Sequence, residues 1–310
     1  MKLRSASLLD LGRIEQIHGE AEARFPAESP PARLWSLVSQ TLTAFLPLTQ
    51  ESLLFVAEQQ GRVVGFVQAS GQTPALSLPP RVAALQVLNL CVANEVDEDQ
   101  VAPSLIEHLV KQAGQKGVHR LFVRIPIDDP FVRVFRMQGF RQFATESVLF
   151  SESPAAGGGG DLAGVRGSRA RDEHRLYNLY RKVTPMEVAH FEAPTYREWR
   201  ALRGVSGQQE VVDRVELVAW CRIHKGSQAR PHILSFMLIP DRELAAGLAD
   251  HVLVACDGQP AWASLRHYDG LMIDALRGRG FSTLLTQALL VRDSTVSETV
   301  ADKALVPSFG

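Results

Sequence analysis

The stretch 88–117 constrains the fold more than any other part of the chain, because its pattern changes from strand-like to helical. Apolar residues stand at every second position from Leu88 to Val92, which is typical of a strand. After a polar turn they recur at helical spacing, at Val101, Leu105, Leu109 and Ala113. Gly117 ends the helix, and a second strand is predicted over 119–125. Two strands joined by such a helix can pair in parallel through a right-handed crossover.

The residues before this crossover predict helices and antiparallel strands. A hairpin is expected about Gln60 and Gly61, since apolar runs flank this turn on both sides. Turn-forming prolines separate two helical patterns near the N-terminus. The expected elements are a strand at 3–6, helices over 8–23 and 32–45, and strands over 53–58, 63–69 and 83–92.

This order of elements and the end of the strand at Leu90, Cys91 and Val92 resemble the GNAT superfamily of acyl-CoA-dependent N-acyltransferases. In that family a strand ending in L-x-V is followed by an R/Q-x-x-G-x-G/A loop, whose backbone amides hold the cofactor pyrophosphate at a helix N-terminus. Laid on without gaps, this loop falls on residues 97–102, where only Ala102 matches a signature position. The resemblance implies an α+β fold, with a mixed, mostly antiparallel sheet flanked by helices. It also implies acetyl-CoA or another acyl-CoA as co-substrate.

The resemblance assigns cofactor contacts residue by residue. A later family motif, N-x-x-A-x-x-x-Y-x-x-x-G-F, falls on Asp128, Phe131, Phe135 and the pair Gly139-Phe140. Phe135 stands where the family has a tyrosine, and phenylalanine cannot give a proton to the leaving thiolate. The cofactor-binding positions implied in this chain are Leu90, Cys91, Val92, Glu98, Gln100, Ala102, Asp128 and Phe135.

The predicted phosphate loop is acidic. Asp97, Glu98 and Asp99 bring three carboxylates to a loop meant for two phosphates, and Gln100 and Ala102 replace glycines that let the backbone approach a ligand. The alternative is a helix N-terminus that caps itself, with Asp97 or Asp99 as the N-cap. The sequence leaves both interpretations open.

The chain contains an internal repeat. The segment from Leu121 matches the segment from Trp262 at a constant offset, which places Asp128 on Asp269 and Gly139-Phe140 on Gly280-Phe281. Upstream the offset changes by six residues, and the simplest place for the missing residues is the phosphate loop of the second copy. We therefore expect two GNAT-like domains in tandem, with their sheets facing one another or side by side.

The domain boundaries follow from composition. Four successive glycines within 151–164 predict a flexible linker. The first half is therefore 1–150 and the second half 165–295, a shorter and degenerate copy, with a loose tail over 296–310. The basic stretch 166–171 is expected to be a solvated linker end or, alternatively, a phosphate contact. Further elements of the second half are expected at 172–182, 196–202, 217–224, 232–239, 241–254 and 261–266.

Composition excludes several classes of protein. The net charge is −1 with interspersed charges, so no nucleic acid or membrane partner is expected. Three scattered cysteines form no disulfide framework or zinc site, and no metal is expected. No leader and no apolar run near ~18 residues is present, so the sequence predicts a cytoplasmic protein.

Few residues are candidates for the chemistry. Cys91 lies where a thioester would sit, although an apolar strand commonly buries a cysteine as a small hydrophobe. His267 and Tyr268 precede the last helix of the second half, near the path of the family's cofactor thiol. The predicted function is acyl transfer to an amine of a small molecule or peptide, with a homodimer as one option. The alternative is a catalytically degenerate GNAT-fold protein, a pseudoenzyme with a binding, regulatory or structural role.

Overall fold

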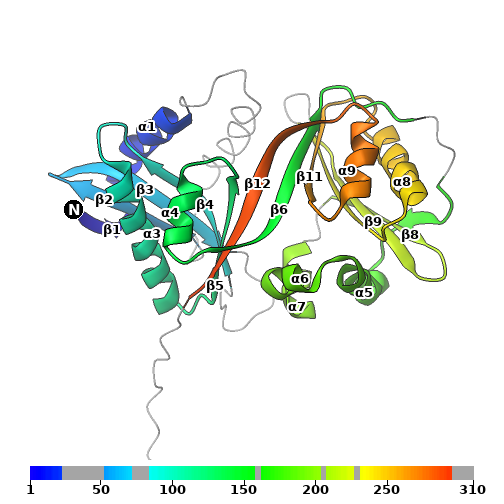
Figure 1. Cartoon of the computed structure of the whole chain (residues 1–310), viewed down its shortest axis with the longest axis horizontal. Helices are drawn as coiled ribbons and strands as arrows, with labels where there is room; N and C mark the ends of the chain where they lie inside the picture. The colour runs from blue at the N-terminus through cyan, green and yellow to red at the C-terminus, as the bar shows by residue number, and fades with distance from the viewer. Residues whose placement is uncertain (23–51, 72–83, 158–161, 204–206, 227–230, 295–310) are drawn as a thin grey trace, which may run out of the picture.

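The computed structural model describes residues 1–22, 52–71, 84–157, 162–203, 207–226 and 231–294. The predicted helix over 32–45, most of the glycine run and the tail 296–310 lie outside these residues. The described residues form one mixed, twelve-stranded sheet with helices on both faces (Figure 1). Its strand order is β1-β2-β3-β4-β5-β12-β6-β11-β10-β9-β8-β7.

The first half supplies one side of this sheet and the helices that cover it. The hairpin predicted about Gln60 and Gly61 is confirmed, and both residues have positive φ, as a tight two-residue turn requires. The predicted parallel crossover is also confirmed. The elements are β1 (Lys2–Ser5), η1 (Leu8–Asp10), α1 (Leu11–Glu22), β2 (Ser52–Gln59), β3 (Arg62–Gly71), β4 (Ala84–Val92), α3 (Glu98–Gln115), β5 (Arg120–Pro126), α4 (Phe131–Met137) and β6 (Arg141–Ser151).

The second half repeats this order on the other side of the sheet. Antiparallel strands lead to β10, which pairs in parallel with β11 through the helix α8. The short elements β7, α6 and β8 were not predicted. The elements are β7 (Val165–Gly167), η2 (Ala170–Asp172), α5 (Glu173–Val183), α6 (Met186–Glu192), α7 (Tyr196–Arg203), β8 (Gln208–Asp213), β9 (Leu217–His224), β10 (His232–Leu238), α8 (Arg242–Val254), β11 (Ala261–Arg266), α9 (Gly270–Arg277) and β12 (Ser282–Asp293).

The two halves exchange their last strands. β12 lies between β5 and β6, and β6 lies between β12 and β11, so each long strand enters the other half's part of the sheet (Figure 1). The register pairs Glu146 with Gln287, its own counterpart in the repeat, which makes the arrangement pseudo-twofold. Leu149 accordingly packs in the second half's core, whereas Leu290 packs in the first half's. Of the two arrangements expected for the sheets of the two halves, the structure shows the side-by-side one. The two sheets are also joined into one continuous sheet.

Helices cover both faces of the sheet in each half. In the first half α3 and α4 pack on one face, and α1 packs on the opposite face with Ile17, Phe66 and Cys91. In the second half α8 and α9 pack on one face, while α5 and α7 cover the other around Trp199 and Trp220. Within the described ranges, no helix has the length and apolar character needed to cross a membrane.

Both halves begin with the same ion pair. Arg4 of β1 makes two hydrogen bonds to Asp10, of 2.7 and 2.8 Å, and Arg166 of β7 makes two to Asp172 at the same distances. Arg166 also contacts Asp213 of β8. The prediction of a solvated linker end at 166–171 is therefore wrong for Arg166, because its guanidinium is held between two carboxylates of the folded second half.

Hydrogen bonds refine the alignment of the repeat. Phe140 N donates to the carbonyl of Phe135, and Phe281 N donates to that of Leu276, which confirms this part of the match. Before the helix the equivalent residues are Asp129 and Asp269, whose amides donate to Pro126 and Arg266. Matching Asp128 to Asp269 is therefore wrong by one residue, because α9 has eight residues and α4 has seven.

The shortening of the second copy is spread over loop and helix. Four residues, 93–96, separate β4 from the N-cap Asp97, whereas only Ile239 and Pro240 separate β10 from the N-cap Asp241. The helix α8 has 13 residues and α3 has 18. The phosphate loop thus accounts for less of the deletion than the sequence predicts, because most of it falls in the helix.

Candidate functional site

The parallel strands of each half separate part-way along their length. β4 pairs with β5 only from Ala84–Val87 to Arg120–Val123, although the strands continue to Val92 and Pro126. β10 and β11 pair only through Leu234 and Ala263 before they separate. Such an opening between parallel strands can admit an extended ligand along the strand edges. Each opening lies between the two strands of a parallel crossover.

The end of β4 carries three predicted cofactor contacts. A bulge next to Val87 shifts the alternation, so that Leu90 and Val92 pack on the α3 side. Cys91 points to the other face, where it is buried with Ile17 and Phe66. This setting fits the alternative that Cys91 is a small buried hydrophobe.

The N-terminus of α3 follows the opening and is already capped. Asp97 is the N-cap, and its carboxylate accepts the amide of Asp99 at 3.1 Å. The amides of Gln100 and Val101 both point to the carbonyl of Asp97, at 3.2 Å. These three amides therefore have acceptors within the chain. This is the self-capped helix that the sequence analysis gives as the alternative to a phosphate loop.

The other predicted positions around this loop differ in burial. Glu98 is half-buried and Gln100 is exposed, whereas Ala102 is fully buried in the core beneath α3. α3 lies close to the sheet at Gly65 of β3, where a Cβ would come within 3.1 Å of Val101. A larger residue at position 65 would therefore push the helix N-terminus outward.

The loop before α3 is tied to α1. Arg13 contacts Glu95 and also donates to the carbonyl of Val63 at 3.2 Å. The backbone amide of Glu95, and then the charges of Arg13 and Arg62, lower the pKa of this carboxyl. The position of the loop therefore depends on the helix that covers the opposite face of the sheet.

The later motif provides no acid. Asp128 is exposed, and it is Asp129 whose carboxylate caps α4 by accepting the amide of Phe131 at 2.8 Å. Phe135 is buried in the core and meets Phe140 edge to face, with 5.1 Å between ring centroids. Phe135 thus acts as a packing residue in this half.

A polar pair missed by the sequence analysis lies at the start of the opening. Asn89 and Gln68 are both buried, and Asn89 Nδ2 donates to Gln68 Oε1 at 2.9 Å. The Oδ1 atom of Asn89 is buried without a hydrogen-bond partner. An unpaired buried acceptor is costly, so it marks a place where a donor would be favoured. The available signal was an asparagine inside a largely apolar strand.

In the second half, ion pairs lie at the end of β11, one of the two strands that border the opening. Arg266 of β11 contacts Glu146 of the exchanged strand β6 and Glu192 of α6. Asp269 accepts the amide of Arg266 at 3.2 Å, and burial raises the pKa of Asp269 to about 6. The hydroxyl of Tyr180 is also buried here, without a hydrogen-bond partner.

The structure does not bring the predicted catalytic candidates together. His267 is exposed, and its amide donates to the carbonyl of Thr145 at 2.9 Å. Tyr268 lies under α6 beside Val188, and burial raises the pKa of its hydroxyl. Cys91 belongs to the α1 side of the first half. Cys91 therefore cannot share one site with His267 and Tyr268 in this arrangement.

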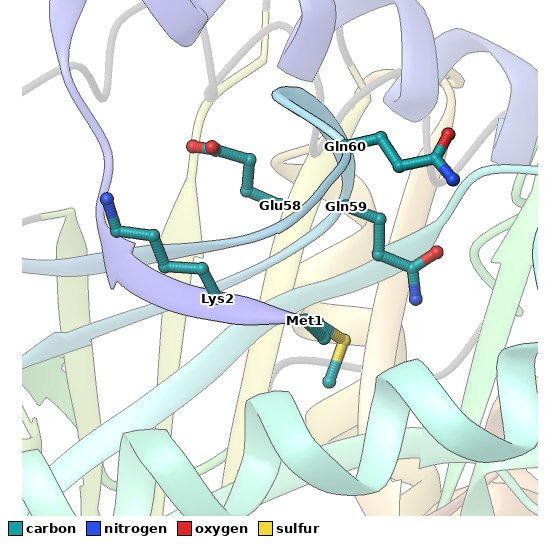
Figure 2. A pocket seen from close by; sticks show the side chains of 5 residues that line it. All are labelled: Met1, Lys2, Glu58, Gln59 and Gln60. Carbon is teal, nitrogen blue, oxygen red and sulfur yellow. The ribbon is translucent and has the colours of Figure 1, made fainter.

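The described residues offer little for other kinds of site. No group of three or more His, Cys, Asp or Glu side chains there is arranged to hold a metal ion. A shallow hollow is lined by Met1, Lys2, Glu58, Gln59 and Gln60 (Figure 2). It lies at the outermost strands of the sheet, away from both strand openings.

Comparison with known proteins gives a family match for part of the chain and similar folds for nearly all of it. Residues 14–140 match the sequence model of the acetyltransferase (GNAT) family. No curated protein sequence matches the chain. A GCN5-related N-acetyltransferase from Sphaerobacter thermophilus is similar in structure, with 14% identity, a TM-score of 0.59 and coverage of 94% of this chain and 95% of that chain. A GCN5-related N-acetyltransferase from Anabaena variabilis has 12% identity and a TM-score of 0.51, over 94% and 72% of the two chains.

A third similar structure is a tandem GNAT protein from the clavulanic acid biosynthesis pathway. It has 14% identity and a TM-score of 0.54, with 94% of this chain and 98% of that chain covered. At these identities the likeness concerns the fold, because one fold carries many functions. Residues 14–140 therefore resemble the GNAT acetyltransferase family in sequence, and the chain as a whole is similar in fold to GNAT proteins, one of them a tandem GNAT protein.

Proposed function

We propose that the chain is an acyl-CoA-dependent N-acyltransferase whose first half takes the acyl-CoA into the opening between β4 and β5. The observation that carries this proposal is the end of parallel pairing at Val87 and Val123, while both strands continue. The family match over residues 14–140 supports the same half. The acceptor is an amine of a small molecule or a peptide, as is usual in this family.

The first half would bind the two ends of the co-substrate differently. The edge of β4 beyond Val87 can hold the pantetheine arm through backbone groups, whatever the side chains. The N-terminus of α3 fits the pyrophosphate less well, because Asp97 caps the helix and Asp99 adds a second exposed charge. The proposed enzyme therefore binds acyl-CoA chiefly through the strand opening.

Acyl transfer needs a proton acceptor for the amine and a donor for the thiolate. Phe135 supplies neither, and Cys91 is buried among apolar side chains. These two observations favour a second candidate function, in which the chain binds acyl-CoA or a related ligand and has lost turnover. This catalytically degenerate alternative uses the same opening, so binding and turnover must be measured separately.

We further propose the tandem division at 1–150, 151–164 and 165–295. Support comes from the two sets of cores on either side of the exchanged strands. The eight cofactor contacts, Leu90, Cys91, Val92, Glu98, Gln100, Ala102, Asp128 and Phe135, stay predictions. The cytoplasmic location and the homodimer also stay predictions.

The test is a calorimetric and thermal-shift titration of the full chain with acetyl-CoA, coenzyme A and longer acyl-CoAs. A ligand that binds the folded state alone, at ~100 times its dissociation constant, adds about 2.7 kcal/mol of stability. We expect a clear shift with acyl-CoA. Release of thiol in the presence of an amine panel then separates the enzyme from the degenerate alternative. No shift at millimolar acyl-CoA would contradict acyl-CoA binding and therefore the proposed enzyme.

A pair of variants locates the site. Asp97→Asn with Asp99→Asn removes two charges at the N-terminus of α3, while Asn at position 97 can still cap the helix. We expect acyl-CoA affinity to rise roughly tenfold, since repulsion of the phosphates falls. Asp257→Asn with Asp274→Asn is the matched control, because it removes two exposed carboxylates of the second half. Equal gains in both double variants would mean that net charge alone is responsible.

A further inference from the structure

The strand β9 carries cations on one face of the second half. Its buried apolar residues Cys221 and Ile223 point to the α8 side, whereas Trp220 packs under α5 and α7. Because side chains alternate along a strand, Arg222 and His224 lie on the same face as Trp220. An arginine in the middle of an otherwise apolar strand is unusual, since buried charges are commonly paired.

Only some of the N–H donors of the Arg222 guanidinium have hydrogen-bond acceptors in the described chain. One terminal nitrogen donates to the carbonyl of Arg203 at the end of α7, and the other donates to Ser235 Oγ at 3.4 Å. The group lies over the Trp220 ring, with 5.5 Å to its centroid. Its Nε atom is buried and has no hydrogen-bond partner. A guanidinium has five N–H donors, so Arg222 keeps unused donors in a partly desolvated place.

Arg203 repeats this pattern beside it. Its guanidinium donates to Gln209 Oε1 at 3.0 Å and lies 5.2 Å from the centroid of the Trp199 ring. Its Nε atom is likewise buried without a partner. Gln209 also accepts the indole N–H of Trp220 at 3.3 Å, which links the two tryptophans and the two arginines into one cluster.

Negative charge near this cluster is scarce. Arg203 has one carboxylate within reach, Glu173 at 3.7 Å, and Glu173 also contacts Arg200 at 3.2 Å and accepts the hydroxyl of Tyr196. Among the ion pairs of the described residues, none includes Arg222. Burial lowers the pKa of Arg203, of Arg222 and of His224, and the charge of Arg222 lowers that of His224 further. The cluster therefore carries positive charge that the described chain does not neutralise.

We infer that Arg203 and Arg222, with His224 alongside, form a binding site for a small oxyanion, a carboxylate or a phosphate, on the α7 side of β9. A planar guanidinium with free N–H groups matches both kinds of oxyanion. The anion would accept hydrogen bonds from the terminal N–H groups that the chain leaves unused and would neutralise the partly buried charges. This site lies in the second half and does not depend on acyl-CoA binding by the first.

The equivalent positions of the first half carry uncharged side chains in place of the arginine. Equivalent amides, Ala93 N to Val64 O and Ile239 N to Val218 O, align the strand pairs of the two halves. Counting four residues along each strand from these positions makes Gln68 the counterpart of Arg222 and Asn89 the counterpart of Ser235. In each half the two residues stand opposite each other on neighbouring strands. The position next to the strand opening is thus neutral in the first half and cationic in the second.

The site has a structural explanation that must be separated from binding. Arg222 could serve only to hold the end of α7 through the Arg203 carbonyl. In that case Arg222→Gln would destabilise the unliganded protein, because the helix end would lose its donor. If the arginine serves a ligand, its removal instead leaves thermal stability unchanged or raises it, because an uncompensated buried charge is gone.

The experiment is a calorimetric titration of the full chain at low ionic strength with sodium benzoate, inorganic phosphate and coenzyme A. We expect saturable binding of benzoate or phosphate, and the tighter of the two identifies the oxyanion. Arg222→Gln should weaken this binding at least tenfold without lowering the melting temperature. Arg200→Gln is the matched control, since Arg200 is an exposed arginine one turn away on α7. It should leave affinity unchanged.

Three outcomes would overturn the inference: no binding of either anion, equal weakening by Arg200→Gln, or a lowered melting temperature of Arg222→Gln together with unaltered anion binding. Binding of coenzyme A that Arg222→Gln abolishes would assign the cations to the co-substrate phosphates. That outcome would also overturn a site separate from acyl-CoA, and the first-half variants would still test the proposed function by themselves.

Discussion

The exchanged strands make an unusual prediction about where a mutation acts. Leu149 precedes the linker in the sequence, but it is fully buried in the second half's core and pairs with Ala263 of β11. Leu290 follows the linker, but it is fully buried in the first half's core and pairs with Val123 of β5. We expect Leu149→Ala to loosen the second half and Leu290→Ala to loosen the first.

The magnitude follows from the burial. Both leucines have 0% exposure, so truncation removes their apolar contacts and leaves a cavity. Leu→Ala changes at such sites cost about 2–5 kcal/mol. Since 1.4 kcal/mol corresponds to a factor of ten, amide exchange in the affected half should accelerate on the order of 100-fold.

The assay is hydrogen–deuterium exchange resolved by peptide. β3 (Arg62–Gly71) reports on the first core and β9 (Leu217–His224) on the second. Leu149→Ala should accelerate exchange in β9 more than in β3, and Leu290→Ala should do the reverse. Equal acceleration of both strands in both variants would show one cooperative unit and refute the assignment of each leucine to a separate core. The opposite pattern would refute the strand exchange.

Two further predictions concern buried carboxylates. Because burial raises the pKa of Asp269 from 3.8 to about 6, protonation stabilises the fold, and the free energy of unfolding should fall as pH rises from 4 to 6. Asp269→Asn should remove this fall in urea titrations and gain about 1–3 kcal/mol at pH 7, whereas a pH profile like that of the parent would contradict the assignment. The pKa of Asp172 is held at about 2, chiefly by its hydrogen bonds to Arg166, so its contribution is present above 3.8 and lost as pH falls through about 2. Asp172→Asn should cost about 1–2 kcal/mol at pH 7 and little at pH 2, and a cost that does not change with pH would be evidence against the ion pair.

The sequence predicts elements whose pattern is local. The hairpin at Gln60 and Gly61 and the crossover after Val92 were found because alternation, turn residues and helical spacing all lie within one short segment. The repeat was found because its motif, which includes Gly139 in one copy and Gly280 in the other, also lies within one short segment of each half. Both glycines have positive φ. The strand exchange was not predicted, because the partner of β6 is set by packing between segments more than a hundred residues apart.

The candidate site shows the same limit. Asp97 was named as a possible cap and is the cap, since the signal is a single residue before a helical pattern. The polar pairs at Asn89 and Arg222 were missed, although each is a polar residue inside an apolar strand. Whether such a residue belongs to a site depends on the face of the strand that it occupies and on the residues opposite it on the neighbouring strand. The sequence pattern of one strand does not identify those neighbouring residues.

The two openings differ at one pair of equivalent positions, and this difference favours the first half as the acyl-CoA site. The amides of Asp129 and Asp269 make Pro126 the counterpart of Arg266, and the pseudo-twofold register makes Gln287 the counterpart of Glu146. Arg266 and Glu146 form an ion pair at the end of the second opening, whereas Pro126 and Gln287 are neutral and cannot form one. Moving the second half's buried ion pair aside would leave charges without partners at low dielectric, which costs several kcal/mol. Pro126 and Gln287 carry no such charges, which supports the proposal that acyl-CoA enters the first half.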